Sequence, residues 1–158
     1  MNYKLVFRVL GLILRVEALL MLPAAAIGFF SRDGSAGAFL LSAAITLAVG
    51  QALAMLPGKN AKMQARDGFA AVALCWITLS LSGALPYVFS GVLPNYVDAV
   101  FETASGFTTT GATVLTFIEG QPNSVLFWRA QTQWMGGVGV LVLALALVPK
   151  LGEGSVYL

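Results

Sequence analysis

Histidine is absent from this chain of 158 residues, and cysteine occurs only once. Without imidazole, Ser-His and Cys-His nucleophile pairs cannot be built, and the usual ligands of zinc and haem are missing. Cys75 has no partner for an intrachain disulfide, and its apolar surroundings, AVALCWITL, predict a small buried side chain. We therefore expect no enzyme activity and no cofactor.

Charged residues are also scarce. They make up 10% of the chain, where about 25% is usual for a soluble protein. Hydrophobic residues make up 58%, and the net charge is only +2, with no basic stretch that would suit nucleic acid. A small soluble domain cannot hide so much apolar surface, so the composition predicts a membrane protein. The long apolar segments described next predict that it is all-α.

Four segments are apolar and long enough to span a bilayer, which takes roughly 20 residues. They cover about residues 7–30, 36–56, 69–89 and 125–148. The first carries Arg8, Arg15 and Glu17 in its first half, and it offers no Ala-x-Ala cleavage site, so we expect it to stay in the mature chain. We expect Arg15 and Glu17 to satisfy one another, or their neighbours, near the inner leaflet.

The distribution of basic residues predicts the orientation of these spans. The loop between the second and third spans carries Lys59, Lys62 and Arg66 against one acid, Asp67. By the positive-inside rule this loop is cytoplasmic. The N-terminus is then cytoplasmic as well, and the long segment 91–123 faces outward.

Segment 91–123 is too long for an idle connection and too apolar for disorder. Pro94 and Asn95 predict a helix start, with Asn95 as the N-cap and Asp98 in the first turn. The stretch NYVDAVFETAS then suits a helix of about 11 residues, or roughly 16 Å. Such a helix crosses only half of a membrane.

The next stretch, GFTTTGATVL, is rich in β-branched residues and contains Gly106 and Gly111. A half-length helix followed by extended backbone is typical of a re-entrant pore loop, where carbonyls that line an ion path replace the ion's water. Glycine lets the backbone adopt a positive φ, so that successive carbonyls point the same way. A phosphate-binding loop is disfavoured because Ala112 stands where its lysine would be. A threonine-rich external loop without a transport role remains the alternative.

Several ordered motifs resemble one family. They are SRDG (31–34), RDGF (66–69), GALPYVFSG (83–91), DAVFETASGFTTTGATVL (98–115) and FWRAQTQWMGGVGVLVLALALVP (127–149). The chain is similar to the Trk/Ktr/HKT superfamily of potassium transporters, above all its bacterial TrkH-type members. The resemblance implies an N-terminal transmembrane helix pair at 1–58, a cytoplasmic loop at 59–68, and the first helix–pore loop–helix repeat at 69–158. Within that repeat it implies a pore helix at about 95–105 and a filter at about 106–113.

The same resemblance implies the site. The family's filter signature falls on residues 108–112, so that potassium would be held by Thr109, Thr110 and Gly111, with Gly106, Thr108 and Ala112 as flanks. Gly111 argues for potassium over sodium. The implied function is potassium uptake across the bacterial inner membrane, and the rival is a non-conducting scaffold or helper subunit that keeps the fold.

The implied partners follow from the number of filter loops. Four loops are needed to surround an ion, and this sequence supplies one. We expect the other three repeats to belong to a longer chain, with a homotetramer as the alternative. The resemblance also implies dimerisation and a cytoplasmic nucleotide-binding regulatory subunit.

Other polar and small residues near the loop leave alternatives open. Asp98 and Glu102 lie one helical turn apart and form either an acidic outer vestibule or a filter support, or else a helix-start carboxylate and a buried residue with a partner. Arg129 is expected to pair with an acid or to reach the interface. Three glycines of QWMGGVG predict close helix packing beside the filter, with a flexible joint as the alternative. They are Gly136, Gly137 and Gly139.

Overall fold

The structure, a computed structural model, describes residues 3–55 and 65–152, and those residues form helices and no strands. The helices are α1 (Tyr3–Ser31), α2 (Ala36–Ala54), α3 (Ala65–Gly83), α4 (Leu85–Phe89), α5 (Tyr96–Phe107) and α6 (Asn123–Gly152). The predicted cytoplasmic residues Lys59 and Lys62 lie outside the described ranges. The predicted all-helical fold is confirmed.

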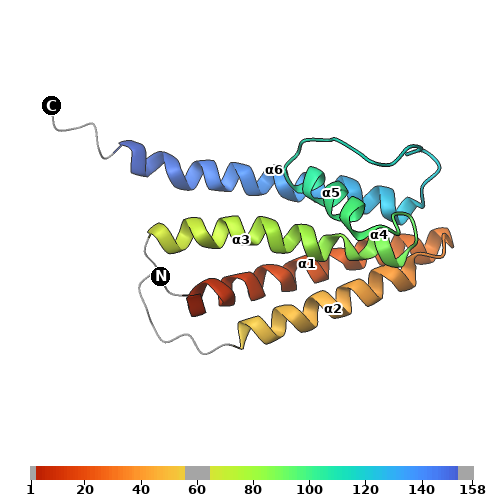
Figure 1. Ribbon diagram of the computed structural model, residues 1–158, viewed down its shortest axis with the longest axis horizontal. Coiled ribbons are helices and arrows are strands. Elements are labelled where there is room, and N and C mark those ends of the chain that lie inside the picture. The colour runs from red at the N-terminus through yellow and green to blue at the C-terminus, as the bar shows by residue number, and fades with distance from the viewer. Residues whose placement is uncertain (1–2, 56–64, 153–158) are drawn as a thin grey trace.

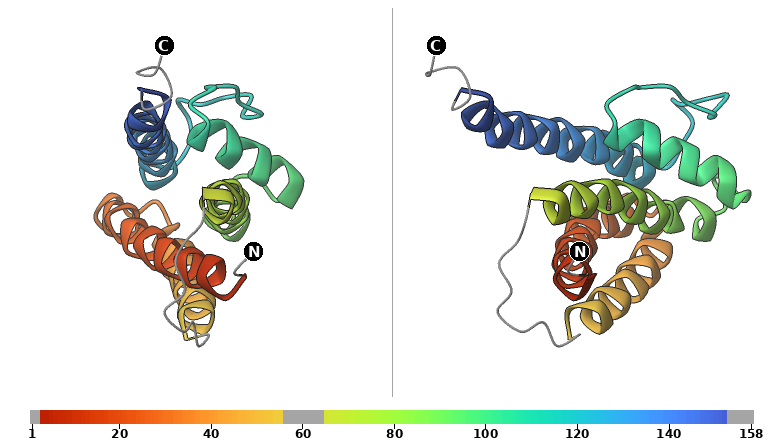
Figure 2. Two further views of the ribbon diagram at one scale, coloured as in Figure 1. Left: turned by 90° about the vertical axis from the view of Figure 1, so that its left-hand side faces the viewer. Right: turned by 60° about the vertical axis from the view of Figure 1, so that its left-hand side comes forward.

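The long helices α1, α2, α3 and α6 run alongside one another, and the short helices α4 and α5 gather at one end (Figure 1). We call this end, which also holds the connection between α1 and α2, the turn end. Figure 2 shows α5 and α6 on one side of α3, and the α1–α2 hairpin on the other. The contacts of α1 with α3 and α6, and of α5 with α3 and α6, join the two sides into one body.

Two segments of the described ranges have both the length and the composition to cross a membrane, namely Ala36–Ala54 and Asp67–Phe89. The other two predicted spans form α1 and α6, which have 29 and 30 residues. The third predicted span is interrupted at Ala84, between α3 and α4. Pro86 near the start of α4 has no N–H to donate. Tyr87 N donates to Ala84 O at 3.1 Å and not to Gly83 O, and the Gly83 carbonyl accepts from Trp128 Nε1 at 3.0 Å.

The main core lies near the turn end and joins the hairpin to the repeat. Its largest members are Met21, Phe39, Tyr87 and Trp128, and the rings of Phe39 and Trp128 meet edge to face at 6.3 Å. A smaller cluster joins α1 to α3 and contains Cys75. The predicted burial of Cys75 is confirmed.

Of the two alternatives expected for Arg15 and Glu17, pairing with one another is not found, and Glu17 instead binds a neighbouring residue. Residues two apart on a helix do not face each other, and the described residues contain no ion pair between these two. Glu17 is fully buried and accepts a hydrogen bond from Ser82 Oγ on α3. Its Oε1 would lie 2.9 Å from a Cβ on Gly83, which would itself lie 2.7 Å from Thr103 Cγ2 on α5. Glu17 therefore lies against α3 beside α5.

Asp33 connects the α1–α2 turn to the start of α6. Its carboxylate accepts from Ser35 N at 3.0 Å and Ser35 Oγ at 2.6 Å. It also accepts from Ser124 N at 3.1 Å and Ser124 Oγ at 2.8 Å. Burial acts to raise the pKa of Asp33, but these hydrogen bonds to the charged form outweigh it and hold the pKa below its ordinary value.

Candidate functional site

The site begins with the half-length helix α5. Asn95 Oδ1 accepts from Val97 N at 3.1 Å, which confirms the predicted N-cap. The helix has 12 residues and is about 18 Å long, roughly half of a bilayer. It begins one residue and ends two residues later than the expected range. At its C-terminal end the ring of Phe107 meets that of Trp76, near the middle of α3, at 6.4 Å.

Two glycines let α5 and α6 approach closely. A Cβ on Gly136 would lie 2.0 Å from the carbonyl oxygen of Phe107, so the predicted role of Gly136 in close packing is confirmed. That prediction is wrong for Gly137 and Gly139, whose Cβ positions have no neighbour within 3.9 Å and 3.6 Å, respectively. A Cβ on Gly106 would lie 2.4 Å from Thr132 Oγ1.

Gly106 is therefore a packing residue in the last turn of α5 and not part of the extended filter segment, contrary to the sequence-based expectation. Glycine has a low helix propensity. The helix nevertheless continues through Gly106 because this residue is buried against Thr132 and because the ring of Phe107 is held against Trp76.

The end of α5 is closed by backbone hydrogen bonds. Thr109 N donates to Gly106 O at 2.9 Å, and Thr110 N donates to Ser105 O at 3.0 Å. These two bonds form a Schellman motif, whose left-handed position is usually glycine. Thr109 occupies that position with φ +57°, an unfavourable conformation for a β-branched residue. Such strain persists only where the surrounding structure enforces it, and it concentrates at functional sites.

The segment that follows presents oxygen atoms that lack hydrogen bonds. Residues 108–114 are all exposed. Within the described ranges, the carbonyl oxygens of residues 108–111 accept no hydrogen bond. Gly111 has φ +76°, which confirms the predicted glycine turn. Unpaired backbone carbonyls need a polar partner such as an ion or water.

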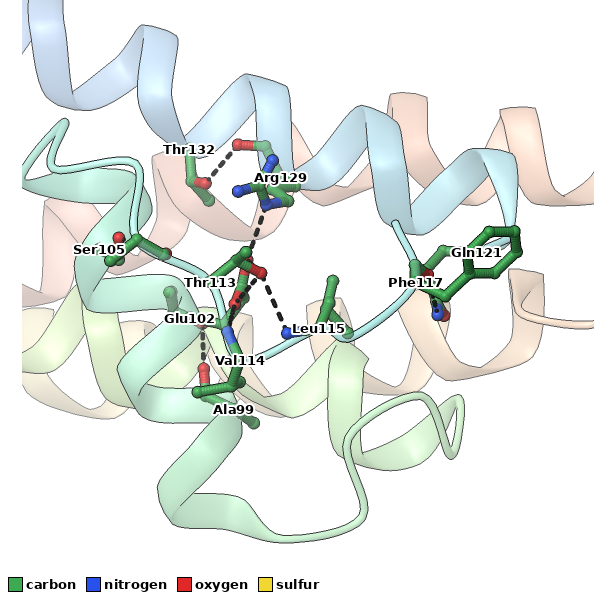
Figure 3. Close-up of polar contacts among 12 residues, drawn as sticks. Ala99, Glu102, Ser105, Thr113, Val114, Leu115, Phe117, Gln121, Arg129 and Thr132 are labelled. Atoms are coloured by element: carbon green, nitrogen blue, oxygen red, sulfur yellow. Dashed lines mark hydrogen bonds and ion pairs between the residues drawn. The ribbon is translucent and has the colours of Figure 1, made fainter. Parts of the chain in front are cut away.

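Glu102 lies behind this segment (Figure 3). Its side chain is 1% exposed, and its Oε1 lies 2.6 Å from Arg129 Nε. Thr113 Oγ1 lies 3.0 Å and 2.9 Å from the two carboxylate oxygens, and Val114 N donates to Oε2 at 3.0 Å. The expected pairing of Arg129 with an acid is confirmed. Asp98 is half-buried one turn earlier and forms no ion pair within the described ranges.

Sequence reasoning missed two residues that hold the segment. Ser105 Oγ donates to the carbonyl of Ala112 at 2.6 Å, and Thr113 binds Glu102. The sequence did not indicate either role, because a serine in a helix and a threonine in a threonine-rich run occur in proteins for many reasons. Arg129 was the available signal, since an arginine in an apolar span needs an acid.

These features define a class of protein. A half-length helix followed by exposed, unpaired carbonyls, held between two longer helical segments, is the helix–pore loop–helix arrangement of cation channels and transporters.

The comparisons identify the family. A sequence match to TrkH, described as a cation transport protein, covers residues 35–158, and the chain belongs to this family. It is 43% identical over 161 residues to the Trk system potassium uptake protein TrkH of Halomonas elongata, covering 100% of this chain and 33% of that protein. It is 38% identical over 162 residues to the protein of the same name from Escherichia coli (strain K12), again covering 100% and 33%.

A solved structure agrees with these relatives. The fold matches the crystal structure of the potassium transporter TrkH from Vibrio parahaemolyticus with a TM-score of 0.88 and 35% identity, over 96% of this chain and 33% of that one. The chain thus spans about a third of the length of the relatives it matches.

Proposed function

We propose that this chain supplies one of the four selectivity-filter loops of a potassium-uptake transporter. Potassium is held by oxygen atoms of Thr109, Thr110 and Gly111, with Thr108 and Ala112 as flanks. The observation that carries the proposal is the run of carbonyls at residues 108–111, which are exposed and accept no hydrogen bond within the described ranges. Neutral oxygens of this kind can replace the hydration shell of a potassium ion.

The electrostatics of α5 support a cation at this position. The partially negative C-terminal end of a helix favours a nearby positive charge, and the segment follows directly after that end. The acidic residue that contacts this segment, Glu102, is paired with Arg129 and is buried. Neutral backbone and hydroxyl oxygens are therefore the ligands of the proposed site, and transport across the membrane requires no covalent chemistry.

One loop cannot enclose an ion. In this proposal, three further repeats of a longer chain complete the ring, as the size of the relatives suggests. The alternative source is three identical subunits. The assembled transporter is a dimer in the bacterial inner membrane and works with a cytoplasmic nucleotide-binding subunit. Its N-terminus is cytoplasmic, and the turn end faces outward.

The test is Gly111→Ser in the full-length transporter, with potassium and sodium uptake measured in cells that lack their own potassium uptake systems. At φ +76° a serine side chain is strained, and a left-handed residue costs roughly 1–2 kcal/mol. Such a shift in filter geometry is expected to lower the preference for potassium about tenfold.

Gly37→Ser is the matched control, because a Cβ at Gly37 has nothing within 4 Å and its backbone has no positive φ. It should leave the potassium preference unchanged. Unchanged selectivity in Gly111→Ser would refute the filter assignment. A full-length protein that is stably expressed but carries no cation would favour the scaffold alternative.

A further inference from the structure

The exposed segment is held from behind by the carboxylate of Glu102. Thr113 and Val114, which this carboxylate binds, lie two and three residues after Gly111. The distances of 2.9 Å and 3.0 Å are those of well-formed hydrogen bonds to a charged acceptor. A short stretch of backbone therefore separates the proposed potassium ligands from a fixed point on α5.

Arg129 pairs with this carboxylate and offsets the cost of burying it. An isolated carboxylate in a low-dielectric environment is costly, and pairing with hydrogen bonds to its remaining lone pairs offsets the cost. Arg129 Nε binds Oε1, while Val114 N binds Oε2 and Thr113 Oγ1 lies near both oxygens. The pair also joins α5 to α6, so the segment is fixed to both helices at one point (Figure 3).

This arrangement disagrees with a vestibule role for Glu102. Its side chain is 1% exposed, and its charge is balanced by Arg129 at 2.6 Å. A balanced, buried charge attracts few ions from solution. The same charge is well placed to determine where the backbone of residues 111–114 lies.

We propose that Glu102 and Arg129 are positioning residues that determine the ion selectivity of the filter through Thr113 and Val114. The inference rests on the proposed function, since it assumes that residues 109–111 hold the ion. Discrimination between potassium and sodium depends on the placement and number of coordinating oxygens. A loosened segment lets these oxygens move closer to the smaller ion, so selectivity falls.

The decisive variant is Thr113→Val in the full-length transporter. It removes the hydroxyl that lies beside Glu102 but changes no charge and leaves the ion pair with Arg129 in place. Thr116→Val is the matched control, because Thr116 is also exposed in this segment and forms no hydrogen bond within the described ranges. We expect Thr113→Val to lower the ratio of potassium to sodium uptake about tenfold, and Thr116→Val to leave it unchanged.

A double-mutant cycle adds a second measurement. Thr113→Val and Glu102→Gln disturb the same contact, so their combined effect on the uptake ratio should be clearly smaller than the product of the two separate effects. Arg129→Lys keeps the positive charge and should restore part of the selectivity that Arg129→Gln loses. Independent effects in the cycle, or equal effects of Thr113→Val and Thr116→Val, would overturn the proposal.

The two proposals fail in different ways. If Gly111→Ser changes selectivity and Thr113→Val does not, the filter assignment stands and the positioning role of Glu102 is wrong. If neither variant changes selectivity while uptake remains, the filter assignment itself is wrong. A loss of uptake by Glu102→Gln at low potassium, with the uptake ratio unchanged, would support the vestibule role and contradict the positioning role.

Discussion

Glu102 on α5 and Glu17 on α1 are both buried, but their surroundings differ. Glu102 on α5 has an arginine partner and hydrogen bonds from Thr113 and Val114. Glu17 on α1 is equally buried, but its hydrogen bond within the described ranges comes from Ser82, and its Oε1 has no partner there. Glu17 also borders an open apolar pocket of about 390 Å³ that is lined by residues of α1, α3, α5 and α6.

The difference separates two kinds of buried acid. A carboxylate that is surrounded by donors and paired with an arginine fixes the groups around it, because any displacement leaves a charge unpaired. A carboxyl group with one hydroxyl partner imposes far less on its neighbours. We therefore expect the region around Glu102 to respond strongly to changes in charge, and the region around Glu17 to tolerate them.

The largest effect is expected for Arg129→Met, which leaves the Glu102 carboxylate buried without its cation. Breaking one side of a buried ion pair costs about 3–5 kcal/mol. The thermal midpoint of the purified full-length transporter in detergent should fall accordingly. Glu17→Gln, which replaces an acid without a cationic partner in the part of the chain that the structure describes, is the comparison and should change the midpoint little. Equal losses in the two variants would end the distinction between the two glutamates.

A smaller effect is expected for Ser82→Ala. It removes the hydroxyl that donates to Glu17, and a buried acceptor left without its donor costs about 1–3 kcal/mol. The same heating experiment measures it. Combining Ser82→Ala with Glu17→Leu should recover part of the lost stability, since the double variant removes both the donor and the acceptor of this hydrogen bond. If the double variant is less stable than Ser82→Ala alone, Glu17 has a partner beyond the contacts described above.

The smallest effect is expected at Asp33, an acid at the turn end. Its pKa is lowered by hydrogen bonds from Ser35 and Ser124. A lowered pKa means that the charged form stabilises the fold at pH values above the ordinary aspartate pKa of about 3.9, and that this contribution is lost as pH falls through the lowered value. Between neutral and acidic pH, the thermal midpoint of Asp33→Asn should therefore fall less than that of the unmodified protein.

The control for this acid response is Glu119→Gln. Glu119 is exposed and forms no hydrogen bond within the described ranges. Its replacement should leave the acid response as it is in the unmodified protein. An identical acid response in Asp33→Asn and the unmodified protein would show that the contacts to Ser124 add nothing measurable.

Local features of the pore loop were predictable from the sequence because they depend on neighbouring residues. The cap at Asn95 and the positive φ of Gly111 follow from the preferences of single residues. The end of α5 was less predictable, because Phe107 is kept helical by its contacts with α3 and α6. The left-handed Thr109 was not predictable, because it opposes the preference of its own residue type.

Contacts between residues that are far apart in the chain could not be predicted from the sequence. Glu17 and Ser82 are 65 positions apart, and Glu102 and Arg129 are 27 apart. A pattern can indicate that Arg129 needs an acid, but several acids were available. The three glycines of QWMGGVG also look alike in sequence. Gly136 faces the Phe107 carbonyl and Gly137 does not, and only the packing of α5 on α6 separates them.

The contact between Asp33 and Ser124 also bears on how the protein is made. The two residues are 91 positions apart, so at 5–20 residues per second the serine is synthesised roughly 5–18 s after the aspartate. Helix α5 and the segment after it lie between these two residues in the sequence. The contact that joins the α1–α2 turn to α6 can therefore form only after both have been synthesised.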